Sequence, residues 1–263
     1  QQPGLSQEEI DSVINLFSSG QLEEALDKVT KLIKTYSENS LLHNITGACY
    51  AGLGQLGSAV KSYERAIQID PDYAKAHYNL GNAHHDLTLQ GFGDLENSIK
   101  CYERSIEIDP DYAEAHNNLG NVLRDLGRLD EAKESYENAL TLNPEFIEAY
   151  FSLSTIHQEI GNLDEMIECL KILLSIEPEI PEAHNMIGIG LDKLHKFEAA
   201  AISYKKAIKI KPDYSEAYNN LANTLKELGQ LNEAVKSYQK AIEITPDYPA
   251  LHNNLGNAYK ELG

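Results

Sequence analysis

The sequence predicts an all-α protein, a right-handed superhelical α-solenoid of antiparallel helix-turn-helix units. The first observation is a period of 34 residues, at which residues 215–248 align with residues 181–214 and with earlier copies. The second is that each unit holds two runs of apolar and small residues at helical spacing. The third is that glycine falls between the two runs and proline follows the second. One helix pair cannot cover its own apolar face, so stacked neighbours must cover it.

The first helix of each unit is predicted from an apolar face, with positions counted from Ser215 as position 1. That face consists of positions 4, 7, 8 and 11, which are Tyr218, Leu221, Ala222 and Leu225. Asp213 and Glu216 have the spacing of a capping box at the helix start. Gly229 ends the helix, where a left-handed backbone conformation is required.

The second helix follows from another periodic run, Ala234, Tyr238 and Ala241, and ends before Pro246. Positions 8, 20 and 27 hold small residues in most units. We expect them to let the two helices approach closely, because a large side chain there would overpack the contact at a cost of roughly 1–3 kcal/mol.

These residues resemble the tetratricopeptide repeat (TPR) family. Its pattern, an aromatic residue followed by Leu-Gly and Tyr, then Ala-x3-aromatic and Pro, appears here as His116, Leu119, Gly120, Leu123, Ala132, Tyr136, Ala139 and Pro144. No unit carries tryptophan. The resemblance implies a protein-interaction scaffold in which the first helices line an inner, concave groove.

The domain organisation is one continuous array without separate globular parts. It is predicted to comprise a disordered lead at 1–5, an array at 6–263, repeats at 6–39, 40–73, 74–112, 113–146, 147–180, 181–214 and 215–248, and the first helix of an eighth repeat at 249–263. Leu255, Gly256 and Tyr259 are typical of internal positions that a second helix would cover. We therefore expect the natural protein to continue beyond Gly263.

The third repeat is five residues too long. We place the extra residues, 88–92, in the turn between its two helices, because loops accept insertions at little cost. Either the insertion is a neutral bulge, or Leu89 and Phe92 are a contact point for another molecule.

Composition limits the classes of partner and the compartment. A net charge of -19 argues against binding to nucleic acid or to an anionic membrane surface. No apolar run is long enough for a transmembrane helix. Cys49, Cys101 and Cys169 lie in separate repeats and are predicted to be buried, reduced thiols, which favours a cytoplasmic protein.

Asparagines recur at positions 6 and 9 of the first helices, on the side away from the predicted core. Because asparagine is a poor helix former, helix propensity does not explain them. An exposed amide both donates and accepts hydrogen bonds, so it can bind the backbone of an extended peptide of any sequence. The alternative is that they bond locally between neighbouring helices. The predicted peptide-binding residues are Asn79, Asn82, Asn118, Asn121, Asn220, Asn223, Asn254 and Asn257.

This asparagine pattern is similar to the TPR region of O-linked N-acetylglucosamine transferases. There the position-6 asparagines hold the backbone of the substrate peptide, and the resemblance implies this role for Asn79, Asn118, Asn220 and Asn254. The same position holds Ile45, Ser152 and Met186 in other repeats, which divides the asparagines into two short segments.

The charge of the groove indicates which peptides it selects. Positions 2 and 13 are largely acidic, with Glu114, Glu148, Glu182, Glu216, Asp86, Asp125, Glu159 and Glu227. A basic clamp for a peptide carboxylate is therefore not predicted, and the partner is predicted to be a neutral or basic extended segment. Repeat six is locally basic, with Lys193, Lys196, Lys205, Lys206, Lys209 and Lys211. These lysines pair either with the acidic repeat five or with a separate partner, and we favour the first.

Catalytic and cofactor sites are not predicted, and no cofactor or metal is expected. His77, His116, His184 and His252 occupy position 4 and are predicted to be core residues, while His84 and His85 lack further metal ligands. The favoured function is a non-enzymatic scaffold that binds an extended peptide in its groove. Two alternatives remain, namely the substrate-recruiting arm of a larger glycosyltransferase-like enzyme, and self-assembly through the last helix.

Overall fold

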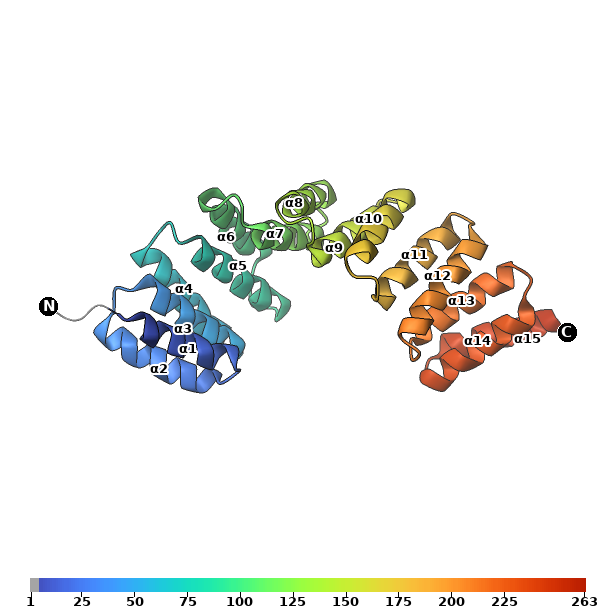
Figure 1. Cartoon of the computed structure of the whole chain (residues 1–263), viewed down its shortest axis with the longest axis horizontal. Coiled ribbons are helices and arrows are strands. Elements are labelled where there is room, and N and C mark those ends of the chain that lie inside the picture. The colour runs from blue at the N-terminus through green and yellow to red at the C-terminus, as the bar shows by residue number, and fades with distance from the viewer. Residues whose placement is uncertain (1–4) are drawn as a thin grey trace. The chain divides into compact units, whose positions relative to one another are not determined.

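The computed structural model describes residues 5–263 as helices joined by short turns, without a strand in this range (Figure 1). The disorder predicted for the lead falls on residues 1–4, which lie outside the described residues. Leu5 is half-buried and packs against the first core cluster, around Val13 and Val29. The chain divides into two compact units, which meet in sequence at Asn143 and Pro144.

Each of these two compact units is a stack of antiparallel helix pairs, one pair for each repeat. In every pair the odd-numbered helix comes first in the sequence. The first unit holds α1 (Gln7–Ser18), α2 (Leu22–Thr35), α3 (Ser40–Gly52), α4 (Leu56–Ile69), α5 (Ala74–Leu89), α6 (Leu95–Ile108), α7 (Ala113–Asp125) and α8 (Leu129–Leu142). The second unit holds α9 (Ile147–Glu159), α10 (Leu163–Ile176), α11 (Pro181–Lys193), α12 (Phe197–Ile210), α13 (Ser215–Glu227), α14 (Leu231–Ile244) and α15 (Pro249–Leu262). The predicted all-α solenoid of helix pairs is thus confirmed within each unit.

The turns inside the pairs follow the predicted glycine rule. Gly127 and Gly229 have φ angles of 74° and 72°, in the left-handed region that glycine adopts without strain. In the sixth repeat His195 occupies this place with a φ of 56°. The predicted capping box at Asp213 is wrong, because Tyr214 is the N-cap residue of α13 and makes no side-chain cap hydrogen bond. Asp213 thus lies one residue too early to cap.

The insertion in the third repeat is not confined to the turn, which corrects the prediction. α5 continues to Leu89 and has 16 residues, whereas α7 has 13. The left-handed glycine is Gly91, with a φ of 83°, and residues 93–94 lengthen the loop before α6. The helix runs on because its next left-handed glycine comes only at residue 91. Leu89 and Phe92 are exposed, as predicted, at 70% and 80%.

The core of a pair forms where a glycine on the first helix meets a tyrosine ring on the second. A Cβ added to Gly120 would lie 2.7 Å from the ring of Tyr136, and one added to Gly188 would lie 2.5 Å from Tyr204. Both rings are fully buried. The prediction that small residues at position 8 permit a close helix approach is therefore confirmed.

The position-4 histidines are not core residues, which corrects a second prediction. Each is half-buried or exposed, and its Nε2 lies within hydrogen-bonding distance of a carbonyl oxygen in the preceding loop. The pairs are His77 with Pro71 at 3.0 Å, His116 with Pro110 at 3.2 Å, His184 with Pro178 at 3.3 Å and His252 with Pro246 at 2.8 Å. Position 4 lies in the first helical turn and faces this loop, so the imidazole fixes the loop to the helix.

The cysteines form no disulfide within residues 5–263, and Cys49 is buried as predicted, whereas Cys101 and Cys169 are only half-buried. Cys101 is half-buried on α6, and burial, reinforced by the charge of Glu64, raises its pKa to about 11 from the ordinary 9.0. At pH 8 the folded protein thus holds far less of the thiolate that reacts with alkylating reagents.

We expect iodoacetamide at pH 8 to alkylate Cys101 on the order of 100-fold more slowly in the folded protein than in urea, since a pKa of about 11 rather than 9.0 lowers the thiolate fraction by that factor. Mass spectrometry of the labelled Cys101 peptide measures both rates. Similar rates in the two states would show that the thiol is not shielded.

Candidate functional site

The predicted asparagines of the first unit are joined by hydrogen bonds on the odd-numbered helices. The side-chain amide of Asn118 on α7 donates to Asn82 Oδ1 on α5 at 2.9 Å and to the Tyr78 hydroxyl at 3.0 Å. Asn82 Oδ1 also accepts from the Tyr102 hydroxyl of α6 at 2.6 Å. This network holds the Asn118 amide in one orientation between two repeats.

The position-6 asparagines bond to position 5 of the preceding repeat, which the sequence did not reveal. Three of the four, all except Asn118, donate an amide N–H to an asparagine carbonyl 35 residues earlier. The pairs are Asn79 with Asn44 at 2.9 Å, Asn220 with Asn185 at 3.2 Å and Asn254 with Asn219 at 3.0 Å. The alternative that these asparagines bond locally between neighbouring helices therefore holds for their N–H donor groups.

The position-9 asparagines bond to the tyrosine of their own pair. Asn121 Oδ1 accepts from the Tyr136 hydroxyl at 2.8 Å, and Asn223 Oδ1 accepts from the Tyr238 hydroxyl at 2.5 Å. Asn257 on α15 is exposed. These bonds orient the amides, and they connect the core tyrosines to the same helix face.

In the sixth repeat, the core tyrosine bonds to a carboxylate instead of to an asparagine. Its position 9 is Ile189, and the Tyr204 hydroxyl instead donates to Asp192 Oδ2 at 2.8 Å. The Thr224 hydroxyl donates to the same carboxylate at 2.8 Å. Burial raises the pKa of Asp192, and these two hydrogen bonds oppose that shift. Burial also raises the pKa of Tyr238, to about 12, so this phenol stays a neutral donor at ordinary pH.

A polar hollow of about 300 Å³ lies over the asparagine network of the first unit. Its lining residues are Asn82, His85, Asp86, Tyr102, Asn118 and Asn121. His85 Nε2 lies 3.4 Å from Asp125 Oδ2, so a second carboxylate stands beside the hollow. Four of the eight predicted residues, Asn79 included, thus lie together on α5 and α7. The other four lie on α13 and α15 in the second unit.

The lysines of repeat six are only partly neutralised. Lys196 Nζ lies 3.6 Å from Asp164 Oδ1 of repeat five, as predicted, while Lys211 pairs with Glu182 of its own repeat at 3.4 Å. Lys205 and Lys206 on α12 are exposed. Lys206 borders a hollow of about 550 Å³ that α10, α11 and α12 line with mixed apolar and charged side chains.

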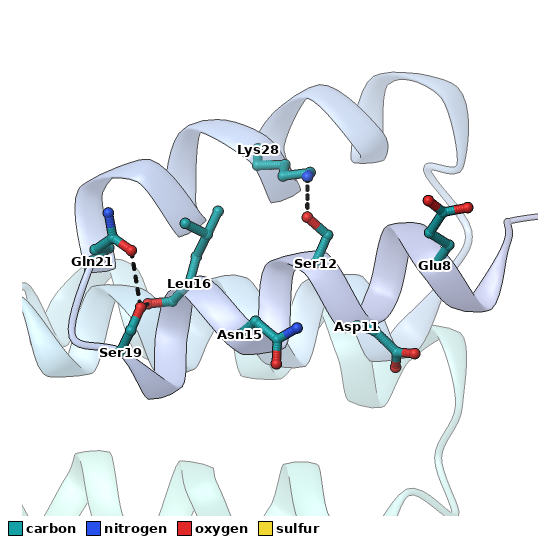
Figure 2. Close-up of a pocket in the computed structure, with 8 residues that line it drawn as sticks. All are labelled: Glu8, Asp11, Ser12, Asn15, Leu16, Ser19, Gln21 and Lys28. Atoms are coloured by element: carbon teal, nitrogen blue, oxygen red, sulfur yellow. Dashed lines mark hydrogen bonds between the residues drawn. The ribbon is translucent and has the colours of Figure 1, made fainter.

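Another hollow, of about 750 Å³, lies over α1 and α2. Figure 2 shows Lys28 pointing to the hydroxyl of Ser12, while Asp11 and Asn15 project from another side of α1. Because these side chains do not converge on one point, we assign no site there.

Within residues 5–263, no group of three or more histidine, cysteine or acidic side chains is arranged to hold a metal ion. Over the same range, no helix has both the length and the apolar character needed to cross a membrane.

Family models match most of the chain. One described as "TPR repeat" matches residues 47–87, 93–123 and 222–263. Others described as "Tetratricopeptide repeat" match 113–146, 147–180, 181–214 and 203–236.

Solved structures share the fold. The C-terminal part of a TPR repeat-containing protein from Cytophaga hutchinsonii has a TM-score of 0.76 at 14% identity, over 93% of this chain and 98% of that one. YrrB, described as a TPR protein with an unusual peptide-binding site, has a TM-score of 0.60 at 23% identity, over 72% and 95%. MamA has a TM-score of 0.57 at 26% identity, over 60% and 92%.

Proposed function

Because the chain belongs to the tetratricopeptide repeat family, we propose that it is a protein-interaction scaffold whose odd-numbered helices bind an extended peptide of a partner. Repeat architecture of this kind is typically non-catalytic and binds protein or peptide partners. The observation that carries the proposal is the asparagine network around the polar hollow on α5 and α7.

The hydrogen bonds within the network favour binding by lowering its entropic cost. The donors of Asn118 are bonded to Tyr78 and Asn82, so the amide is already held before a ligand arrives. Asn79 uses one N–H for Asn44, which leaves its second N–H and its carbonyl oxygen for a peptide backbone. Each net hydrogen bond contributes only about 1 kcal/mol, so several must act together.

The charges beside the hollow favour neutral or basic segments. Asp86 lines it and Asp125 stands next to His85, while the whole chain carries a net charge of -19. An acidic peptide would be repelled, and a lysine or arginine side chain would be attracted to Asp86.

The test begins with a library of unstructured 12-residue peptides that differ in charge, from which binders are selected. The Asn118→Ala variant is expected to bind a selected peptide roughly 5- to 10-fold more weakly, because the hydrogen bond of about 1 kcal/mol that its carbonyl oxygen accepts from the peptide is lost. Isothermal titration calorimetry measures the affinity, and circular dichroism checks that helicity is unchanged. Asn232→Ala, on the exposed surface of α14, is the matched control.

Backbone recognition is tested separately from the protein side. Selected peptides with N-methylated backbone amides should bind more weakly, because methylation removes the donors that asparagine carbonyls accept. Affinity that survives both Asn118→Ala and N-methylation would refute binding through the asparagines.

Two other functions stay predictions. They are a substrate-recruiting arm of a larger glycosyltransferase-like enzyme and a self-assembling scaffold. The contacts within residues 5–263 favour neither of them over a peptide-binding scaffold.

A further inference from the structure

The second helix of the sixth repeat, α12, exposes an apolar side chain where the other complete repeats expose a charge. Ile202 lies two residues before the buried Tyr204 and is 58% exposed. The residues at the same place in the other complete repeats are all charged and exposed, namely Asp27, Lys61, Lys100, Glu134, Glu168 and Lys236. The fold of a repeat therefore does not require an apolar residue here, and leaving one in water is unfavourable.

Ala199 extends this apolar surface by one helical turn. It is exposed, and it lies three residues before Ile202, so the two side chains share one face of α12. The residues at the same place in the other complete repeats are all polar, namely Glu24, Ser58, Asn97, Glu131, Glu165 and Glu233. The sixth repeat thus departs from the repeat pattern at two neighbouring surface positions, and both departures make the surface more apolar.

This surface is one wall of the hollow of about 550 Å³ between α10 and α12. Both helices pack against α11, which lines the hollow between them. Ile167 of α10 and Ile187 of α11 are 6% and 8% exposed, so the base of the hollow is apolar as well. Along α10 the lining extends from Asp164 to Leu174, a length of about 15 Å. The hollow is therefore long enough to accommodate several turns of a helix.

The border of the hollow carries more positive than negative charge. Asp164 lies 3.6 Å from Lys196. Glu168 lies 3.5 Å from Lys171. These two carboxylates are the acidic residues that line the hollow, so each is already paired, and Lys206 adds a third lysine. In a chain with a net charge of -19, this local excess of positive charge favours an acidic ligand.

The walls of the hollow favour a helical ligand over an extended one. All three walls are helices, whose backbone groups are hydrogen-bonded within each helix. The Ser203 hydroxyl on the apolar wall donates to the carbonyl oxygen of Ala199 at 3.1 Å. An extended segment would lose hydrogen bonds to water here and find few replacements for its backbone. A helix bonds its own backbone and presents only side chains.

We propose that the hollow between α10 and α12 binds an acidic amphipathic helix from a partner protein. The apolar stripe of that helix covers Ile202 and Ala199, and a glutamate or aspartate beside the stripe pairs with Lys206. A second copy of this chain is disfavoured as the source, because two chains with a net charge of -19 repel each other. This surface is separate from the asparagine network on α5 and α7, and it selects the opposite charge.

The probe comes from a phage-displayed library of 14-residue amphipathic helices. Their apolar stripe varies among leucine, isoleucine and phenylalanine, and the flanking positions vary among glutamate, glutamine and lysine. The library is selected on the 263-residue chain and counter-selected on Ile202→Lys, because lysine is the residue at this place in the second, third and seventh repeats. The selected helices should carry glutamate beside the stripe. Lysine-rich helices, or none that distinguish the two proteins, would overturn the proposal.

The affinity of a selected peptide, labelled with fluorescein and stapled because short helices are marginal in water, is measured by fluorescence anisotropy. Ile202→Lys should weaken binding at least about 10-fold without lowering the melting temperature. Lys206→Glu should weaken it roughly 5- to 10-fold, and a peptide with lysine in place of its glutamate should recover binding to that variant. Lys205→Glu, on α12 but outside the hollow, is the matched control. An equal loss from Lys205→Glu would assign the effect to net charge and overturn the proposal.

Three further measurements separate this ligand from the alternatives. A proline in the middle of the peptide should abolish binding, and full affinity with the proline would mean that the hollow takes an extended segment. A dimer seen by light scattering without peptide, which Ile202→Lys dissociates, would make a second copy the occupant. Ile202→Lys should leave unchanged the affinity for extended peptides selected on the asparagine network, so each site can fail independently of the other. Equal loss of both ligands would show that one surface binds both and would overturn the proposal.

Discussion

Gly120→Leu is expected to lower the free energy of unfolding by about 3 kcal/mol, whereas Gly256→Leu should leave it unchanged or raise it by up to about 1 kcal/mol. Both glycines hold position 8 of a first helix, so their sequence contexts match. They differ in what a side chain would meet. Tyr136 lies 2.7 Å from a Cβ on Gly120, and nothing lies within 4 Å of one on Gly256.

The size of the effect follows from the burial of the ring. Tyr136 is fully buried and bonded to Asn121, so it cannot move aside without breaking other contacts. Alanine is tolerated at this position in the seventh repeat, where Ala222 is buried in the same core cluster as Tyr238. Leucine adds three further carbon atoms, which the close packing of a protein interior cannot absorb.

Urea unfolding followed by circular dichroism measures both variants, and Gly120→Ala gives an intermediate point. Equal destabilisation by leucine at residues 120 and 256 would contradict the packing explanation. It would also show that Gly256 is covered in solution by a contact that residues 5–263 do not supply.

The repeat organisation was predictable from sequence because the residues that pack each helix pair recur once in every period. Small residues at position 8, alanines such as Ala132 and the turn glycines recur at fixed spacing, since each unit solves the same packing problem. The insertion at residues 88–92 was placed wrongly for the same reason. A period gives the number of extra residues, and the location of the helix end depends on where the next left-handed glycine falls.

The candidate site was predictable only in part. The sequence showed asparagines on a face away from the core, but it did not show that Asn79 and Asn220 donate to residues 35 positions earlier. That pairing joins position 6 to position 5 of the preceding repeat, so it depends on the offset between stacked helices. The joint presence of asparagine at both positions was a usable signal for this pairing.

The position-4 histidines show a different limit. These histidines lie at the spacing of the apolar face of the first helix, and their burial was predicted for this reason. An imidazole at the start of a helix also reaches the preceding loop, as His77 does with the carbonyl of Pro71 at 3.0 Å. Periodicity identifies the direction of a side chain around the helix, but it does not identify contacts beyond the helix end.

Tyr102→Ala is expected to remove about 4 kcal/mol of stability, because it empties a buried site in the core of the third repeat. Tyr102 is 1% exposed, its ring lies against Gly81, and its centroid is 5.9 Å from that of Tyr78. Tyr102→Phe is the matched control. It should cost only about 1 kcal/mol, because Asn82 still accepts from Asn118 when the hydroxyl is gone.

The loss should be local, because helices in each unit pack mainly against their neighbours in sequence. Hydrogen exchange followed by mass spectrometry should show faster exchange in α5, α6 and α7 of Tyr102→Ala, and unchanged exchange in α13 and α14. Partial opening of this kind would also move the side chains of the asparagine network out of their bonded orientations. The affinity of the first compact unit for a peptide should therefore fall as well. Equal loss of protection in all helices would mean instead that the chain unfolds as one cooperative block, in which a substitution in any repeat weakens every binding surface at once.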